Sequence, residues 1–127
     1  MIVYRVEVVV RPEQLPRARA MFAALVQQSR TVPGVRHFDI LQDPADERRF
    51  VSVEVFEDRT AVDRQGDLPL VDEVLAAFDE VLLEGPRGAI FRVSATEPWP
   101  ATATAPAGTA TFTRATQVDY PRPDGGQ

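Results

Sequence analysis

The stretch that decides the fold is VPGVRHFDILQDP, residues 32–44. A PG pair opens it and QDP closes it, and both combinations are typical of turns. Between the turns, apolar and polar side chains alternate with the period of a strand. Phe38 and Ile40 fall on one side, and opposite them lie His37, Asp39 and Leu41. We therefore predict a short strand between two turns, and it carries the only histidine of the chain.

The residues that follow predict the partner of this strand. The sequence RFVSVEVF, residues 49–56, alternates three valines with Phe50, Ser52, Glu54 and Phe56. The intervening QDPADE has the proline and aspartate chemistry of a turn. Because the two strands are only about six residues apart, we expect an antiparallel hairpin.

Flanking segments extend this hairpin into a complete pattern. Residues 2–11 are rich in β-branched residues and predict a strand, and a helical apolar stripe follows from Pro16 and stops near the PG turn. After the hairpin we expect a short helix over residues 59–65 and a longer one over 70–85 that Gly85 caps. A last strand is predicted over residues 89–96.

The order of these elements is β-α-β-β-α-β, which predicts an α+β, ferredoxin-like fold with an antiparallel sheet and helices on one face. Several strands also carry apolar residues on the face that the helices leave open, namely Val3, Val9, Val51, Val53, Val55, Phe91 and Val93. A second subunit is the economical cover for such a face, so we predict a homodimer.

Composition divides the chain near residue 97. Residues 1–96 form the predicted domain, whereas residues 97–127 hold five of the eleven prolines and begin with alternating proline, alanine and threonine. We expect this second segment to be an extended arm. Residues 109–120 have partial strand character and could add a strand to a sheet, and a disordered tail is the alternative.

Charge and residue usage exclude several functions. The net charge of −5 disfavours nucleic acid as a partner, because phosphate recognition needs clustered cations. The chain has no cysteine and one histidine, so thiolate and multi-histidine metal sites are excluded. A carboxylate metal site stays open, but no D-x-D-x-D-G spacing is present and no metal is expected. No apolar run has the length of a signal-peptide core or a membrane span. We expect a cytoplasmic protein that does not bind membranes.

Residues 33–62, PGVRHFDILQDPADERRFVSVEVFEDRTAV, carry a family resemblance. They resemble the antibiotic biosynthesis monooxygenase domain, whose members typically show a PG-x-x-x-(Y/F)-D-(V/I)-x-QD-(P) strand followed by RFV-x-x-E-x-(Y/F)-x-D. The positions that fit this pattern in order are Pro33, Gly34, Phe38, Asp39, Ile40, Gln42, Asp43, Pro44, Phe50, Val51, Glu54, Val55, Phe56 and Asp58. The resemblance extends over roughly residues 1–96.

This resemblance implies a dimeric α+β barrel with a pocket between sheet and helices. It also implies a small aromatic substrate and O2, because members include oxygenases that convert anthrone-like polyketides to quinones without flavin, haem or metal. We therefore expect no cofactor. Other relatives degrade haem, process a signalling sugar or act in cyclisation.

Two departures from the family pattern bear on activity. Many members carry histidines in an H-x-x-(T/S)-P-H segment, where this chain reads QGDLPL from Gln65 to Leu70. The haem-degrading relatives share an Asn, Trp and His set, but this chain has no asparagine and its only tryptophan is Trp99 in the arm. Haem degradation is therefore not expected.

Three side chains are candidates for catalysis. A cofactor-free oxygenase must take a proton from an activated phenol or anthrone and shield the reduced species from water. His37 has a suitable ordinary pKa, although it could be an exposed strand residue. Glu54 shares a face with Ser52 and two phenylalanines and could have a raised pKa, or it could pair with Arg5 or Arg92. Arg92 could hold a phenolate or simply form a salt bridge.

The remaining candidates would bind the substrate. Tyr4 could hydrogen-bond an oxygen atom of the substrate while packing on its ring, and Trp99 between two prolines could cover the pocket mouth or contact a partner subunit. The set of substrate-binding candidates is Tyr4, Phe22, Phe38, Phe50, Ser52, Phe56, Gln65, Phe78 and Trp99. The phenylalanines could equally be plain core residues.

Three functions remain open at this point. The leading hypothesis is a cofactor-independent oxygenase of an aromatic polyketide-like metabolite. The alternatives are a cyclase or isomerase of the same fold and a ligand-binding auxiliary protein without catalysis.

Overall fold

The computed structural model describes residues 1–100 and divides the chain into two units, Met1–Ser94 and Ala95–Gln127. The first unit holds all described helices and strands, which are β1 (Ile2–Val10), η1 (Pro12–Gln14), α1 (Leu15–Ser29), β2 (Val35–Asp43), β3 (Asp46–Phe56), α2 (Arg59–Gly66), α3 (Pro69–Val81) and β4 (Leu82–Arg92). This confirms the predicted order of elements. The predicted strand over residues 109–120 lies outside the described residues.

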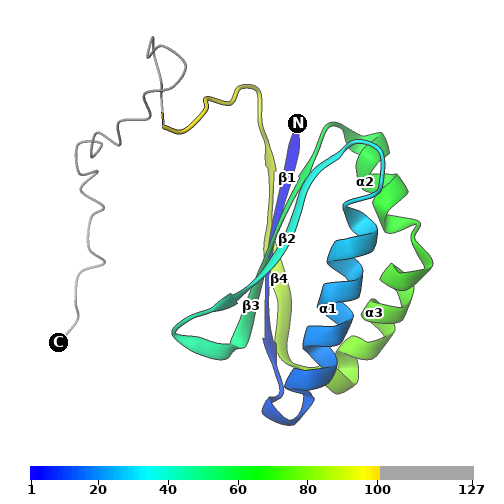
Figure 1. Cartoon of the computed structure of the whole chain (residues 1–127), viewed down its shortest axis with the longest axis vertical. Helices are drawn as coiled ribbons and strands as arrows, with labels where there is room; N and C mark the ends of the chain where they lie inside the picture. Colours follow the sequence, from blue (N-terminus) through cyan, green and yellow to red (C-terminus); the bar gives the residue numbers. More distant parts are fainter. Residues whose placement is uncertain (101–127) are drawn as a thin grey trace, which may run out of the picture. The chain divides into compact units, whose positions relative to one another are not determined.

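The four strands form one antiparallel sheet in the order β2-β3-β1-β4. All the helices of this unit lie on the same face of the sheet (Figure 1). The fold is therefore the expected ferredoxin-like α+β arrangement, with one sheet face covered and the other uncovered within the described chain.

The register decides which side chains face the helices. Val6 on β1 lies opposite Ser52 on β3, which in turn lies opposite Ile40 on β2, and these positions belong to the covered face. Val8, Val10 and Phe50 pack there against α1 and α3 in the larger core cluster. A second cluster at the other end of the sheet gathers around Phe38, Phe56 and Ala61.

The PG turn has a steric reason for its glycine. Gly34 has φ of 87°, which L side chains rarely adopt, and a Cβ atom at this position would lie 2.6 Å from the Cβ of Ala61 in α2. Asp58 caps the same helix, because its side chain accepts a hydrogen bond of 2.9 Å from the backbone N–H of Ala61. The motif thus fixes the place where α2 crosses the end of the hairpin.

The boundary between α3 and β4 was predicted wrongly. The helix ends at Val81 and the strand begins at Leu82, so residues 82–85 belong to the strand, and Gly85 is not a helix cap. Gly85 lies inside β4 with φ of 92°, where the pairing with β1 shifts register. The error arose because Leu82 continues the apolar spacing of the helix, although it is buried opposite Val10 as a strand residue.

The turn of the hairpin is also shorter than expected. Asp43 pairs with Asp46, so only Pro44 and Ala45 connect the strands, rather than the six residues QDPADE. Asp43 stabilises this turn by accepting a hydrogen bond of 2.8 Å from the backbone N–H of Ala45. Among the described helices, none is long and apolar enough to cross a membrane.

Candidate functional site

A cavity of about 290 Å³ lies between the covered sheet face and the helices. Its floor comes from β1, β2 and β3, its roof from α1, α2 and α3, and Pro86 of β4 contributes to one side. Its apolar lining consists of Val6, Val8, Phe22, Leu25, Ile40, Phe50, Val71, Val74, Leu75, Phe78 and Pro86. The remaining lining residues are Ser52, Glu54 and Gln65. This is the composition of a small-molecule site, with apolar walls and a few polar groups.

Glu54 lies at the middle of the sheet floor. Its cross-strand neighbours are Tyr4 on β1 and Phe38 on β2, so aromatic side chains flank it on both sides. Burial raises the pKa of the Glu54 carboxyl to about 7, because the charged form loses its hydration. The carboxylate therefore becomes available as a base near neutral pH.

The proposed ion pairs of Glu54 do not form in the described chain, where no salt bridge includes this residue. Arg5 lies on the opposite face of the sheet and approaches Glu7 at 4.0 Å. Arg92 is exposed at the end of β4, opposite Ile2. Within residues 1–100, therefore, no cation pairs with Glu54.

Glu7 on the uncovered face provides a contrast within the same sheet. Arg87 donates a hydrogen bond of 2.8 Å to its Oε1 atom, and Arg49 donates one to Oε2. These two guanidinium groups lower the pKa of Glu7 below its ordinary value. Glu7 and Glu54 thus have opposite environments, and Glu54 rather than Glu7 is poised to exchange a proton near neutral pH.

Gln65 brings a neutral amide to the roof. It is 9% exposed, and its Nε2 atom donates a hydrogen bond of 3.1 Å to the Oγ of Ser29, which is fully buried in α1. This bond connects α1 to α2 and fixes the orientation of the amide beside the cavity.

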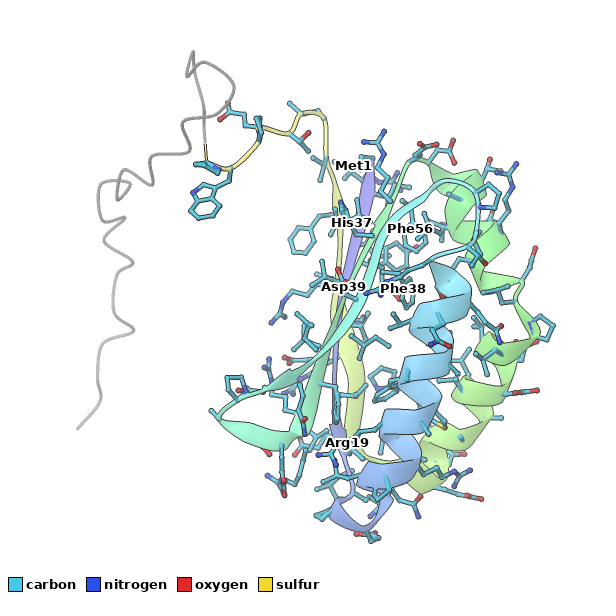
Figure 2. The ribbon with its side chains drawn as sticks, in the orientation of Figure 1. Met1, Arg19, His37, Phe38, Asp39 and Phe56 are labelled. Atoms are coloured by element: carbon cyan, nitrogen blue, oxygen red, sulfur yellow. The ribbon has the colours of Figure 1, made fainter. Side chains whose placement is uncertain are left out.

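His37 is not part of the cavity. It lies opposite Val55 on the uncovered face, and its side chain is exposed. Figure 2 shows Phe38 and Phe56 between sheet and helices, with His37 on the side away from them. Geometry therefore gives His37 no access to a substrate bound at Glu54.

The structure brings together six of the predicted site residues around the cavity, namely Phe22, Phe50, Ser52, Glu54, Gln65 and Phe78. Phe22 and Phe50 meet edge to face, with ring centroids 5.2 Å apart. Phe38 and Phe56 are instead buried in the second core cluster. Tyr4 packs edge to face on Phe56 at 5.5 Å and lines a shallow groove over β4.

Arg92 does not line the cavity. Arg92 borders a separate depression at the start of β1, together with the segment from Glu57 to Arg59. Trp99 is 79% exposed and belongs to the second unit of the chain, so its role over the pocket stays a prediction.

The residues that sequence reasoning missed are mostly aliphatic. Leu25 of α1 and Val71 and Leu75 of α3 lie within the apolar stripes that predicted these helices. The pattern predicted that they face the sheet but not that they line a cavity with Glu54. Pro86 was missed because it fell in the segment between the predicted helix and the last strand.

A family model for antibiotic biosynthesis monooxygenases matches residues 1–76, which include β1, β2, β3 and the cavity's polar residues. The chain belongs to the antibiotic biosynthesis monooxygenase family. This confirms the resemblance drawn from the hairpin sequence. No curated protein matches the chain.

Solved structures share the fold of this chain. A candidate antibiotic biosynthesis monooxygenase from Nitrosomonas europaea is similar at 24% identity and a TM-score of 0.69, with 73% of this chain and 98% of that one covered. One from Deinococcus radiodurans gives 14% identity and a TM-score of 0.71, covering 77% and 97%. A protein from Mycobacterium tuberculosis is similar at 19% identity and a TM-score of 0.68, with 75% of this chain and 96% of that one covered. These TM-scores establish a shared fold.

The QGDLPL segment, residues 65–70, contributes one residue to the cavity. Gln65 lines it with an amide that stays neutral at every ordinary pH. The described residues contain no group of three or more His, Cys, Asp or Glu side chains that could hold a metal ion.

Proposed function

We propose that this protein is a cofactor-independent monooxygenase that oxidises a hydroxylated aromatic metabolite of the polyketide type with O2. The observation that carries the proposal is Glu54, a partly buried carboxyl with no cationic partner among the described residues, which lines an apolar cavity and whose pKa burial raises to about 7. Membership of the antibiotic biosynthesis monooxygenase family supports the reaction class.

Glu54 would act as the base in the first step. Its carboxylate takes a proton from the activated methylene carbon of an anthrone, and the electron pair left behind forms an extended enolate. The apolar lining keeps water away from this carbanion, which then gives one electron to O2. The resulting superoxide and ring radical combine into a carbon–oxygen bond.

The same carboxyl group can complete the reaction. Glu54, now protonated, returns its proton to the peroxide, and loss of the second methylene proton with cleavage of the oxygen–oxygen bond yields the quinone carbonyl and water. One anthrone and one O2 thus give one quinone and one water, with no external reductant. Oriented aromatic walls such as Phe22 and Phe50 would hold the ring plane over the carboxyl group.

The test is oxygen uptake by the full chain with an anthrone, after treatment with a chelator and removal of flavin. We expect O2 and anthrone to disappear in equal amounts, with quinone formed at the same rate. Product formation at an equal rate without O2 would overturn the oxidation and favour the cyclase or isomerase hypothesis. Binding of the anthrone without turnover would favour the auxiliary, ligand-binding hypothesis.

We also propose that the protein is a homodimer that covers the open face of the sheet. Val51, Val53 and Val55 of β3 alternate onto this face, and Val3 lies beside both Val55 and Phe91. Phe91 is 49% exposed in the single chain, which is a large apolar surface to leave in water. A second copy of the chain would bury this strip by isologous contact.

A further inference from the structure

The cavity carries charge of only one sign. Among the residues that line it, Glu54 is the only ionisable side chain, and none is an arginine or histidine. The other polar groups are the hydroxyl of Ser52 and the amide of Gln65, both neutral. A bound anion would therefore meet no positive charge in the part of the chain that the structure describes.

The arginines of the described residues are engaged elsewhere or lie away from this cavity. Arg49 and Arg87 bind Glu7 on the uncovered face, and Arg30 pairs with Asp39 at 2.7 Å beside β2. Arg92 is exposed beyond the end of the cavity. An anionic group on a ligand would have to lose its hydration without a compensating ion pair, and it would lie beside the carboxylate of Glu54.

The amide of Gln65 has a defined orientation toward a ligand. Its Nε2 atom is held by the Oγ of Ser29 at 3.1 Å, so the carbonyl oxygen Oε1 projects in a different direction from the same planar group. No fully buried polar side-chain atom of the described residues lacks a hydrogen bond, and no donor within the described chain binds Oε1. Because Gln65 lines the cavity, this oxygen is the acceptor that its side chain can offer to a ligand.

Two hydrogen-bond acceptors on opposite sides of an apolar cavity select a ligand with two hydrogen-bond donors. Glu54 projects from the sheet floor and Gln65 from the helical roof. We propose that the site selects an uncharged, planar aromatic ligand that donates one hydroxyl to Glu54 and a second to Gln65, and that it rejects carboxylated or phosphorylated analogues. This inference rests on the proposed function, because it takes the cavity as the substrate site and names the substrate class.

The size of the cavity supports a small ring system as the probe. A volume of about 290 Å³ is at the lower end of the range of roughly 300–1,000 Å³ that is common for ligand pockets. Small fused-ring phenols are therefore suitable probes of the site. The matched pair is 1,5-dihydroxynaphthalene, which has two hydroxyl donors, and 5-hydroxy-1-naphthoic acid, in which a carboxylate replaces one of them.

Binding of these probes to the full chain is measured by calorimetry at pH 8 without O2. At this pH Glu54 is largely ionised, since its pKa is about 7. We expect the carboxylate to bind at least about 30-fold more weakly than the diol, in line with the cost of a buried unpaired charge. Equal affinity for the two probes would overturn the inference, and so would binding of neither.

Two variants locate the discrimination. Glu54→Gln removes the negative charge of the site. In this variant the carboxylate probe should therefore bind less than about tenfold more weakly than the diol. Gln65→Leu should weaken the diol about tenfold and leave 1-naphthol, which has one hydroxyl, unchanged. Gln27→Leu on the exposed face of α1 is the matched control, and circular dichroism verifies that each variant folds.

These outcomes separate the inference from the proposed function. Diol selectivity that depends on Gln65, together with absence of oxygen uptake with an anthrone, would retain the ligand class and remove the oxidation. If Gln65→Leu and Gln27→Leu bind the diol equally well, the assigned role of Gln65 is wrong even when the protein oxidises an anthrone.

Discussion

Glu54 is the residue whose environment differs most from what its chemistry prefers. Carboxylates are seldom buried unless a cation or several donors accompany them, because the lost hydration is costly. Among the residues that the structure describes, Glu54 has neither, and burial raises its pKa to about 7. Burying the Glu54 carboxylate lowers the stability of the folded protein but gives the carboxyl group a pKa near neutral pH. Such perturbed pKa values are common in catalytic sites.

This environment predicts a pH dependence of stability. The pKa of Glu54 is about 7 in the folded protein against an ordinary value of 4.5. Between these two pH values the folded state holds a proton that the unfolded chain has lost, so the free energy of unfolding falls as pH rises through this window. The full difference is on the order of 3 kcal/mol and is reached above pH 7.

Glu54→Gln should remove most of this fall, because glutamine does not ionise. We expect the variant to exceed the wild type by roughly 2–3 kcal/mol in unfolding free energy at pH 8 and to match it within about 1 kcal/mol at pH 4.5. Urea titrations at the two pH values measure this. Glu47→Gln at an exposed position of the same strand serves as control and should keep the wild-type pH dependence.

At the residue scale, the sequence predicted which side chains lie on the same face of β3 as Glu54. It did not predict whether the Glu54 carboxyl would be paired with a cation or buried alone. The alternation Phe50, Ser52, Glu54 and Phe56 is enough to place these four side chains together. It cannot distinguish a buried carboxyl from one paired with Arg5 or Arg92, because that depends on the register of strands far apart in the chain. His37 was a candidate by residue type alone, and strand parity places it on the other face.

At the scale of elements, the close approach of β4 to β1 depends on Gly88. A Cβ atom at this position would lie 2.0 Å from the carbonyl oxygen of Arg5 and 2.9 Å from the Cα of Val6. Both are backbone atoms of the neighbouring strand, so they cannot move aside as a flexible side chain would. Pro86 reaches the cavity from this same segment of β4.

Gly88→Ala should therefore destabilise the protein by at least about 2 kcal/mol, since the clash must displace one strand from the other. Thermal unfolding followed by circular dichroism measures the loss. Gly66→Ala is the matched control, because nothing lies within 4 Å of a Cβ atom there, and the residue is helical. A Gly88→Ala protein as stable as Gly66→Ala would contradict the described packing of β4.

The elements themselves were largely predictable, and their junctions were not. The strands, α1 and α3 follow from an apolar period, whereas the short helix η1 was not predicted. The PG turn was predicted from its residue types, and its glycine has φ of 87°. The junction of α3 and β4 was missed because Leu82 satisfies both the helical stripe and the pairing with Val10. A residue that suits two structures locally is assigned only by its distant neighbours.

At the scale of the whole molecule, one face of the sheet is covered by no helix of the described chain, although it carries apolar side chains. Its valines and Phe91 form an apolar strip, while Glu7 with Arg49 and Arg87 forms a charged cluster toward one end. A homodimer is the proposed cover, and the apolar strip would supply most of its stability.

Val53→Glu tests this assembly. A carboxylate in the centre of the strip would lose its hydration in the dimer without a partner, so we expect the mass measured by light scattering to fall from two chains to one. Ala76→Glu, at an exposed position of α3, adds the same charge away from the sheet and should leave the mass unchanged. A wild-type protein that is already monomeric at high concentration would remove the proposal.

The most direct test of the account is the pH profile of oxygen uptake, compared between the wild type and Glu54→Gln with a saturating anthrone. Glu54 must be ionised to accept the proton, so the wild-type rate should rise with pH and reach half its maximum near the Glu54 pKa of about 7. The variant should lose at least about 100-fold in rate and should lack this inflection. An unchanged rate and profile in Glu54→Gln would contradict the assignment of Glu54 as the base.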